Sequence, residues 1–234
     1  MSVATPTKTA EPTQSSAVTL ALLWQNSVGK KFLMALTGIV LFLYVIAHLL
    51  GNLQIYMGSE KIDAYARFLH ANQGMLWFAR LVLLAAVLTH ATAGVILWLD
   101  KGRARPVAYQ TPGNVQSTVA SRTMIWSGLV ILLFVVFHVA NLTLGAGIPG
   151  FQDVKPSVNV PAAFRVTWTA LIYIVAMVGL GFHLWHGLYS MWQSLGFRHP
   201  RYTPGLRAAA ALIATLIALG NISFPVAVLT GLVR

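Results

Sequence analysis

The sequence predicts an all-α integral membrane protein, a bundle of five transmembrane helices that contains a duplicated two-helix hairpin. Of its 234 residues, 57% are hydrophobic and 9% are charged, whereas about 25% are charged in a typical soluble domain. Five apolar segments are each close to or longer than the roughly 20 residues that cross a bilayer. A histidine lies inside each of the first four of these segments.

The elements follow in order from composition and hydropathy. Residues 1–23 are rich in Ser, Thr and Pro and are predicted to form a disordered cytoplasmic tail without a secretory signal. Residues 24–234 are predicted to form one transmembrane domain. Its expected parts are a first span at about 32–50, a short interfacial helix within 59–70, a second span at about 76–99, a third at 123–144, a Gly- and Pro-rich loop at 145–161, a fourth span at 164–193 and a fifth at 208–232.

The histidines recur at nearly constant spacing. His48 and His138 are 90 residues apart, and His90 and His183 are 93 apart. Their neighbourhoods repeat as well: Met34, Thr37 and Gly38 match Met124, Ser127 and Gly128, and Gly94 matches Gly187. A duplicated hairpin related by an axis along the membrane normal would place His48 and His138 at one depth and His90 and His183 at another.

The net charge of +11 could indicate a nucleic-acid partner, but the basic residues fall in loops between apolar segments and not on one polar face. Membrane topology explains them better, because cytoplasmic loops carry the excess of Lys and Arg. With five spans, ten basic residues lie on one side and six on the other. The N-terminus is therefore expected in the cytoplasm and the C-terminus outside, with His48 and His138 near the outer face.

The chain has no cysteine, which excludes thiolate ligands and covalent haem attachment through CxxCH. Two imidazoles at one depth suit a haem with both axial positions filled. We therefore expect a haem-binding domain in which His48 and His138 ligate an outer haem and His90 and His183 an inner one. His186 lies one turn from His183, and spacing alone barely separates them, but the repeat selects His183.

Five glycines are spaced to face the same interior, where they would let a flat macrocycle approach the backbone or let helices pack closely. They are Gly38, Gly94, Gly128, Gly181 and Gly187. The competing class of protein is a histidine-bearing transporter or a haem-free anchor, in which the imidazoles bind substrate, relay protons or pack.

Four segments carry a resemblance to a known family: SVGKKFLMALTG (27–38), HLLGNLQ (48–54), EKIDAYARFLH (60–70) and FHLWHGLYSMWQSLG (182–196). From about residue 25 onward the chain resembles the single-chain, two-haem cytochrome b membrane anchor of succinate:quinone oxidoreductase, respiratory complex II. The resemblance implies a multi-pass protein of a bacterial cytoplasmic (inner) membrane with two haem b groups, held by the same histidine pairs. It leaves the oligomeric state of the complex open.

The same resemblance implies two soluble partners on the cytoplasmic side, a flavoprotein that carries FAD and oxidises succinate, and an iron–sulfur protein that passes electrons to quinone. The chain would then be a subunit of succinate dehydrogenase, without a succinate-oxidising site of its own, that delivers electrons to menaquinone or ubiquinone. Some fumarate-reducing relatives carry a glutamate two residues before the fourth haem ligand, but this chain has Gly181 there. That departure favours succinate oxidation over the alternative, a fumarate reductase anchor.

Quinone reduction needs hydrogen-bond donors near the carbonyl oxygens, where negative charge develops. The candidates at the inner end are Ser27, Lys30, Lys31, His186 and Gln193. Their structural alternatives are a helix cap for Ser27, membrane topology for the lysines and interfacial polarity for Gln193. A rival outer site would use Glu60, Asp63 and His70, which could exchange protons with the outside through the short interfacial segment.

Overall fold

The computed structural model describes residues 23–104 and 117–234, and the regular structure within these ranges is helical. Five helices there are long and apolar enough to cross a membrane. They are α2 (Ser27–Asn52), α4 (Gln73–Arg103), α6 (Met124–His138) together with the π-helical turn that continues it to Thr143, α8 (Thr167–Ser194) and α9 (Thr203–Leu229). The predicted all-α membrane bundle is confirmed, while the predicted disordered tail lies outside the described residues except for Leu23.

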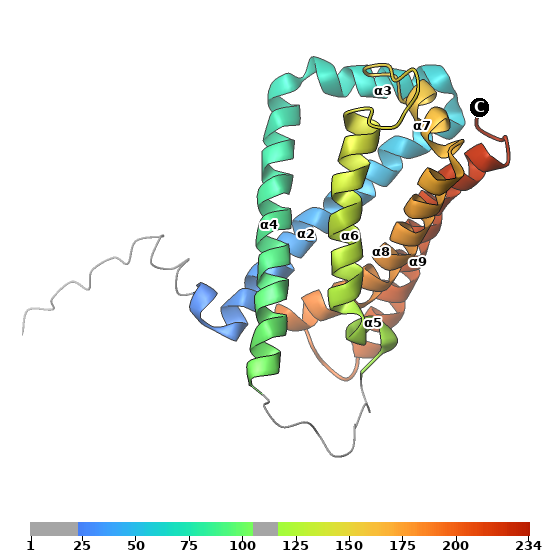
Figure 1. Ribbon diagram of the computed structural model, residues 1–234. Coiled ribbons are helices and arrows are strands. Elements are labelled where there is room, and N and C mark those ends of the chain that lie inside the picture. Colours follow the sequence, from blue (N-terminus) through green and yellow to red (C-terminus); the bar gives the residue numbers. More distant parts are fainter. Residues whose placement is uncertain (1–22, 105–116) are drawn as a thin grey trace, which may run out of the picture.

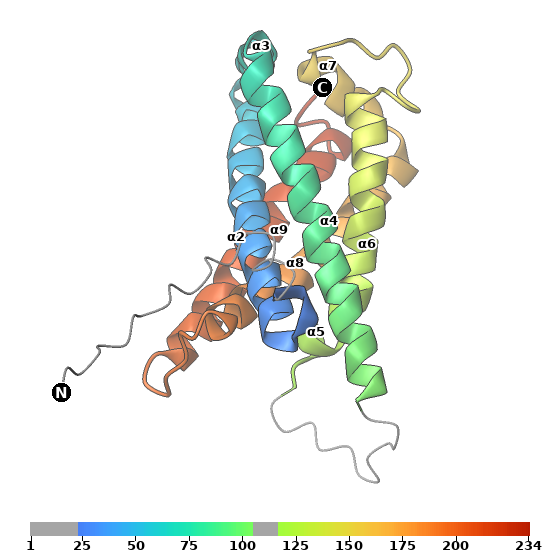
Figure 2. The ribbon, with the colours of Figure 1, turned by 90° about the vertical axis from the view of Figure 1, so that its left-hand side faces the viewer.

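The five long helices run side by side between two ends of the bundle, which Figure 1 shows as its lower and upper ends. α2 begins at the lower end, where α5 (Val119–Arg122) also lies, and the C-terminus lies at the upper end (Figures 1 and 2). The interfacial helix α3 (Ser59–Ala71), predicted within 59–70, and α7 (Pro156–Phe164) lie across the upper end. An odd number of spans thus separates the start of α2 from the C-terminus.

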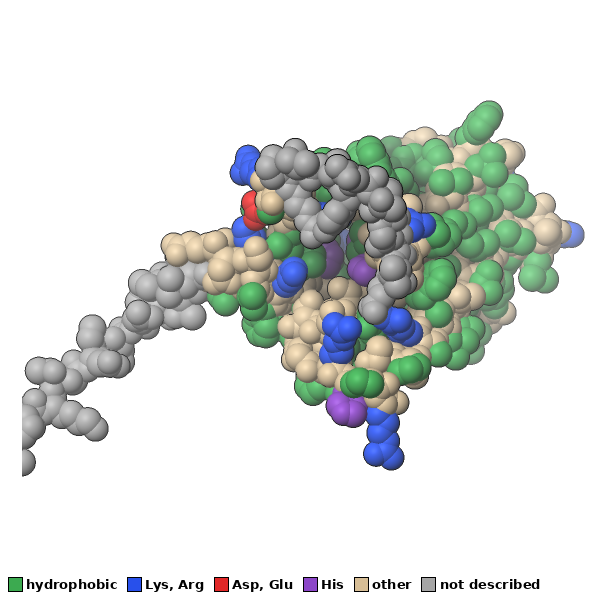
Figure 3. Space-filling view, turned by 90° about the horizontal axis from the view of Figure 1, so that it is seen from below, with side chains coloured by type: hydrophobic (Ala, Val, Ile, Leu, Met, Phe, Trp, Pro, Cys, Tyr) green, Lys and Arg blue, Asp and Glu red, His purple; other side chains and the backbone are tan. Residues whose placement is uncertain are grey.

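The side chains at the helix contacts are small, and many of those on the outside are large and apolar. Ala93 and Ala170 are fully buried, whereas Trp168 is 76% exposed and Leu133 63% exposed. In lipid, helices associate through close packing of small residues, because the solvent is as apolar as the side chains. Hydrophobic side chains accordingly cover the flank in Figure 3, as expected of a surface that faces lipid.

Local signals explain where α2 and α3 begin. The Asn26 side chain accepts a hydrogen bond from the Gly29 amide at 2.6 Å, so Asn26 caps α2, and the alternative role considered for Ser27, that of the helix cap, falls to its neighbour. A 3₁₀ turn, η1 (Leu53–Met57), follows α2. Gly58 then adopts φ 108°, a backbone conformation that a side chain disfavours, and so turns the chain into α3.

Two boundaries differ from the prediction. The segment 145–161 is not all loop, because α7 begins at Pro156, and proline is well placed in the first turn of a helix. α7 then ends at Phe164, so the fourth span begins at Thr167 and not at 164. α6 also ends in a π-helical turn, η2 (Val139–Thr143), which follows His138 directly.

The two ends of the described bundle carry different charges. The lower end has eight basic residues and one acidic residue: Lys30, Lys31, Lys101, Arg103, Arg122, Arg198, Arg201, Arg207 and Asp100. The upper end has six basic and three acidic residues: Lys61, Arg67, Arg80, Lys155, Arg165, Arg234, Glu60, Asp63 and Asp153. Blue basic side chains surround the lower end in Figure 3.

Acidic side chains join helices at each end. At the lower end, the Lys30 Nζ atom lies 2.6 Å from Asp100 Oδ2, which ties α2 to α4. At the upper end, buried Asp63 of α3 accepts hydrogen bonds from the Ser157 amide at 3.1 Å and the Ser157 hydroxyl at 2.8 Å. Asp63 therefore satisfies the first turn of α7 and fixes it to α3.

Replacing Asp100 with Asn should destabilise the bundle, because Lys30 has a side chain only 9% exposed and would lose its counter-charge. Asp100 is 35% exposed, so we expect a loss of about 1–2 kcal/mol, or roughly 2–8 °C in melting temperature for a chain of this size. Thermal unfolding in detergent measures it. Lys31→Gln, at an exposed neighbour, is the control, and equal melting of the two variants would contradict a structural ion pair.

Candidate functional site

The structure brings the four histidines of the first four spans together as two pairs. The rings of His48 on α2 and His138 on α6 have centroids 5.7 Å apart. Those of His90 on α4 and His183 on α8 have centroids 6.1 Å apart. Each pair therefore joins one helix of the first hairpin to one helix of the second, as the repeat predicts.

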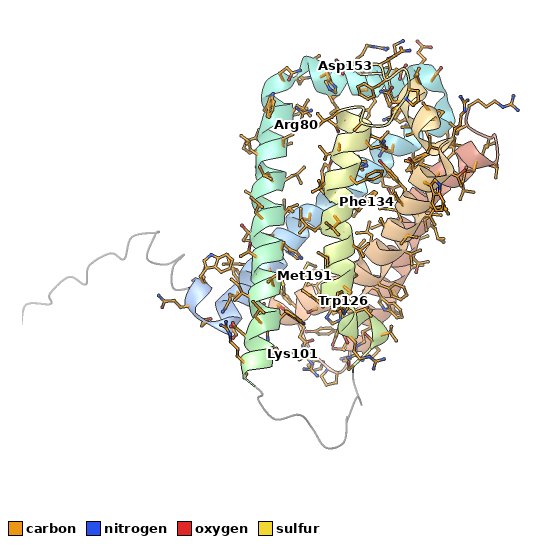
Figure 4. All side chains as sticks on the ribbon, viewed as in Figure 1. Arg80, Lys101, Trp126, Phe134, Asp153 and Met191 are labelled. Atoms are coloured by element: carbon orange, nitrogen blue, oxygen red, sulfur yellow. The ribbon has the colours of Figure 1, made fainter. Side chains whose placement is uncertain are left out.

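The two pairs lie at different heights in the bundle. Gly38 of α2 faces the His90 ring, and His48 follows it by ten residues on the same helix. Ten residues of helix rise about 15 Å. On α6, Figure 4 labels Trp126 low on the helix, beside Ser127 at the His90–His183 level, and Phe134 higher, where its ring lies 5.6 Å from His138. We call the two levels the lower pair and the upper pair.

The lower pair is held by equivalent segments in the two halves of the chain. His90 Nδ1 lies 3.0 Å from the Met34 carbonyl and 3.3 Å from Thr37 Oγ1. A carbonyl oxygen only accepts, so Nδ1 carries the proton and donates it to Met34. The Nε2 atom of His90 is then the nitrogen with a free lone pair.

The second half repeats this arrangement with a serine. Ser127 Oγ donates to the Met124 carbonyl at 3.1 Å and lies 3.3 Å from His183 Nδ1. Because the serine proton is already used, its oxygen accepts from His183 Nδ1–H. Thr37 and Ser127 are equivalent positions of the repeat, and so are Gly38 and Gly128. A Cβ atom at Gly38 would lie 3.3 Å from the His90 ring, a tight contact, so this glycine makes room for the imidazole. A Cβ atom at Gly128 would lie 3.5 Å from the His183 ring, an ordinary contact distance.

The upper pair is held by tyrosines. His138 Nδ1 lies 3.1 Å from the Tyr173 hydroxyl on α8. His48 Nδ1 lies 3.5 Å from the hydroxyl of Tyr44, one turn earlier on α2. Tyr173 in turn donates to Asn141 Oδ1 at 3.3 Å. The contacts of His138 are thus shorter and deeper in the bundle than those of His48.

The ligand chemistry of these pairs fits one metal ion between two imidazoles. Among the described residues, each of the four Nδ1 atoms has a polar partner and no Nε2 atom does. A histidine that ligates a metal characteristically donates a hydrogen bond from its other ring nitrogen, which sets the tautomer and the orientation of the ring. Two imidazoles that bind one metal at about 2 Å from opposite sides have centroids about 6 Å apart, close to both spacings here.

Each pair supplies only two nitrogen ligands, which suits a metal whose other positions are filled by a macrocycle. In the part of the chain that the structure describes, no three His, Asp or Glu side chains gather as they would around a bare ion. Gly94 and Gly187 leave space, since a Cβ at Gly187 would meet nothing within 4 Å and one at Gly94 only Met34 Sδ at 4.0 Å. Gly181 instead packs on Ala218 of α9, as the close-packing alternative expected.

The other three histidines lie apart from the pairs. His186 is half-buried on α8, and no ring contact in the described chain joins it to another histidine. His70 is exposed on α3 with Nδ1 at 2.9 Å from the Ala66 carbonyl. His199 is exposed in the turn before α9, where its Nδ1 accepts from the Arg201 amide.

The structure does not join the inner quinone candidates into one hydrogen-bonded cluster. Ser27, Lys31 and Gln193 are exposed at the lower end, and Lys30 is engaged with Asp100. α2 and α8, which carry these residues and His186, do pack against each other. The inner candidates are therefore separate groups at the lower ends of two adjacent helices.

The outer quinone candidates also separate. Asp63 is buried and bound to Ser157, so its carboxylate has a structural role at the start of α7. Glu60 and His70 are exposed on α3. The outer site therefore stays a prediction, in which the Asp63 carboxylate already accepts two hydrogen bonds from Ser157.

Three residues of the site escaped the sequence reasoning. Tyr173 stands in an apolar run, where an aromatic residue is usually a packing residue, and Tyr44 does so too. Asn141 follows His138 by three residues in a segment expected to be an ordinary end of a span. The one available signal was the polarity of Asn141 itself, which is unusual inside an apolar segment.

Comparisons with known proteins now complement this geometry. Residues 101–221, a little over half of the chain, match a family described as succinate dehydrogenase/fumarate reductase transmembrane subunit. No curated protein and no solved structure matches the chain. The matched region spans α6 and α8, and with them His138 and His183. The chain therefore belongs to the family of succinate dehydrogenase/fumarate reductase transmembrane subunits and is a multi-pass membrane anchor of that oxidoreductase complex.

Proposed function

We propose that this chain is the single-chain, two-haem cytochrome b anchor of a succinate dehydrogenase. His48 and His138 would hold one haem b, and His90 and His183 the other. The observation that carries the proposal is the geometry of the four imidazoles, which form two cross-bundle pairs. Three of the rings are hydrogen-bonded through Nδ1 so that Nε2 is free to ligate, and the Nδ1 atom of His48 lies 3.5 Å from the Tyr44 hydroxyl.

Haem supplies reversible one-electron oxidation and reduction of its iron. The chain's own residues do the remaining work. The Met34 carbonyl and the Ser127 hydroxyl hold the lower imidazoles in the ligating tautomer, and Tyr173 does so for His138. The apolar bundle keeps water away from both levels, so the imidazoles stay neutral and available as ligands.

The orientation follows from charge. We place the lower end in the cytoplasm of a bacterial cell, because it carries the larger number of basic residues in short connections. The flavoprotein and iron–sulfur subunits would dock there, since this end presents exposed Lys and Arg side chains and one acidic residue among those described. The lower pair is then the inner haem site and the upper pair the outer one.

The direction of turnover is proposed from Gly181. Fumarate-reducing relatives with a glutamate at this position have a carboxylate in the span, but here a Cβ atom at 181 would lie 3.2 Å from the Cβ of Ala218. The packing of α8 on α9 thus leaves little room for any side chain. This supports succinate oxidation over fumarate reduction as the physiological reaction.

Quinone would be reduced near the lower end of α2 and α8, close to where electrons enter. Ser27, Lys31 and Gln193 are exposed there and can donate to a quinone carbonyl, and half-buried His186 lies two turns deeper on α8. Lys30 takes part less directly, because its ammonium group is bound to Asp100.

The topology is tested by reporter fusions at the two termini. We expect a cytoplasmic reporter to be active at residue 1 and a periplasmic reporter at residue 234, because five spans separate the ends. A fusion after residue 104, at the lower end, should agree with the N-terminal fusion. Activity of the same reporter at both termini would refute the proposed orientation.

Haem ligation is tested by spectroscopy of the purified complex, with pyridine haemochrome quantitation. The intact chain should carry two haem b per polypeptide. His90→Ala and His183→Ala should each remove the same spectral component, and His48→Ala and His138→Ala the other, because one iron loses an axial ligand in each case. His186→Ala is the matched control and should keep both components.

A chain without a reduced b-type spectrum would instead favour the transporter or haem-free class. Loss of one and the same component on changing His48 and His90 would contradict the pairing while leaving haem binding intact.

The quinone site is tested by substitution in the assembled complex with haem content monitored. Ser27→Ala, Lys31→Ala and Gln193→Leu should each lower quinone reduction, by about a hundredfold where a donor to the developing charge is lost. Glu60→Gln and His70→Ala are the matched arm at the upper end and should leave turnover unchanged. The opposite pattern would move the reaction to the outer site.

A further inference from the structure

His138 is the end of a chain of hydrogen bonds that begins at a backbone carbonyl. The Asn141 Nδ2 atom donates to the Ala146 carbonyl at 2.8 Å. The Tyr173 hydroxyl donates to Asn141 Oδ1 at 3.3 Å and lies 3.1 Å from His138 Nδ1. Asn141 and Tyr173 are 3% and 6% exposed, so these hydrogen bonds are shielded from solvent.

Each link in the chain determines the direction of the next. A carbonyl oxygen only accepts, so Ala146 turns the Asn141 amide with Nδ2 toward it and Oδ1 toward Tyr173. Tyrosine has one hydroxyl proton, which it gives to Asn141. Its oxygen must then accept from His138, which makes Nδ1 the protonated nitrogen and Nε2 the ligating one.

The surroundings hold Tyr173 in place. Its ring meets those of Phe134 and Phe164 edge-on, with centroids 4.9 Å and 4.8 Å away. The π-helical turn at Val139–Thr143 carries Asn141, and the Ala146 amide closes back onto the Ala140 carbonyl at 2.9 Å. Single π-helical turns are frequent at functional sites.

Comparison of the two repeats shows that only His138, among the four histidines, has residues like Tyr173 and Asn141 at the corresponding positions. Thr37 and Ser127 are equivalent and both reach the lower histidines. At the upper level, however, the position equivalent to Asn141 is Gly51, and the one equivalent to Tyr173 is Arg80. Arg80 projects from α4 near the upper end in Figure 4 and lies over the Trp77 ring at 4.9 Å.

We propose that Tyr173 and Asn141 are positioning residues that make the upper haem site asymmetric, with His138 the more electron-donating of its two ligands. The inference rests on the proposed haem ligation. An acceptor at Nδ1–H makes the other ring nitrogen a stronger donor to the metal, which stabilises the oxidised iron. Tyr173 therefore makes the reduction potential of the upper haem lower than it would be without this hydrogen bond.

The test is a redox titration of both haems in the assembled complex, with the two components followed separately. Tyr173→Phe should shift the potential of the upper component to more positive values and leave the lower component unchanged, with two haems retained. Asn141→Leu should shift the same component in the same direction by less, because Tyr173 stays in reach of His138 but loses its own acceptor.

Two matched controls separate positioning from general packing. Tyr44→Phe removes a tyrosine hydroxyl beside the other ligand of the same haem, where the 3.5 Å contact is weak, and should cause a smaller shift than Tyr173→Phe. Ser127→Ala removes the acceptor of His183 and should shift only the lower component. Each variant is also melted, so that a loss of stability is distinguished from a change in ligand strength.

Three results would overturn the proposal: no shift in Tyr173→Phe, an equal shift of both components, or an equal effect of Tyr44→Phe. Loss of the upper haem in Tyr173→Phe would also contradict it, because the proposal expects both haems to be retained with one potential shifted. Absence of haem from the unsubstituted complex would contradict the proposed function itself and is read before any variant is compared.

Discussion

The need of a buried imidazole for a hydrogen-bond partner is the constraint on which the rest of this structure depends. Water is scarce inside a bundle surrounded by lipid, so a ring nitrogen must find its partner on a helix. The Met34 carbonyl of α2 serves His90 of α4, and Tyr173 of α8 serves His138 of α6. Each contact joins the two helices of one hairpin, and it therefore fixes how these helices are rotated about their axes. Gly38 follows from the same requirement, because a Cβ atom there would crowd the His90 ring.

The duplication explains why one requirement is met twice, and its exceptions show where the two levels diverge. At the lower level, equivalent residues do equivalent work, since Thr37 and Ser127 both stand 3.3 Å from a histidine Nδ1. At the upper level, Asn141 and Tyr173 have Gly51 and Arg80 as their counterparts. The duplicated helices thus bring the histidines together in the same way, and differences at two positions give the two histidines of the upper pair different surroundings.

Hydropathy and the repeat predicted the five spans, the interfacial helix α3 and both histidine pairs, because each depends on local composition or on a regular spacing. The contacts that join distant segments could not be predicted from the sequence. Lys30 and Asp100 are 70 residues apart, and Asp63 and Ser157 are 94 apart, and nothing in either neighbourhood indicates the partner. α7 was missed because its two prolines suggest a loop, although Pro156 stands where a helix accepts one.

The two ends of the bundle are built differently. At the upper end, α3 and α7 cover the bundle and are fixed to each other by Asp63, with Phe164 packed on Tyr173 below them. At the lower end most basic side chains have no acidic neighbour in the described chain, so they remain available to a partner. The two histidine levels are about 15 Å apart, near half of the hydrocarbon thickness of about 30 Å. In the proposed function, the lower haem would lie near the basic face where the partner docks and would receive its electrons. The upper haem would lie beneath α3 and α7, which cover the opposite end of the bundle.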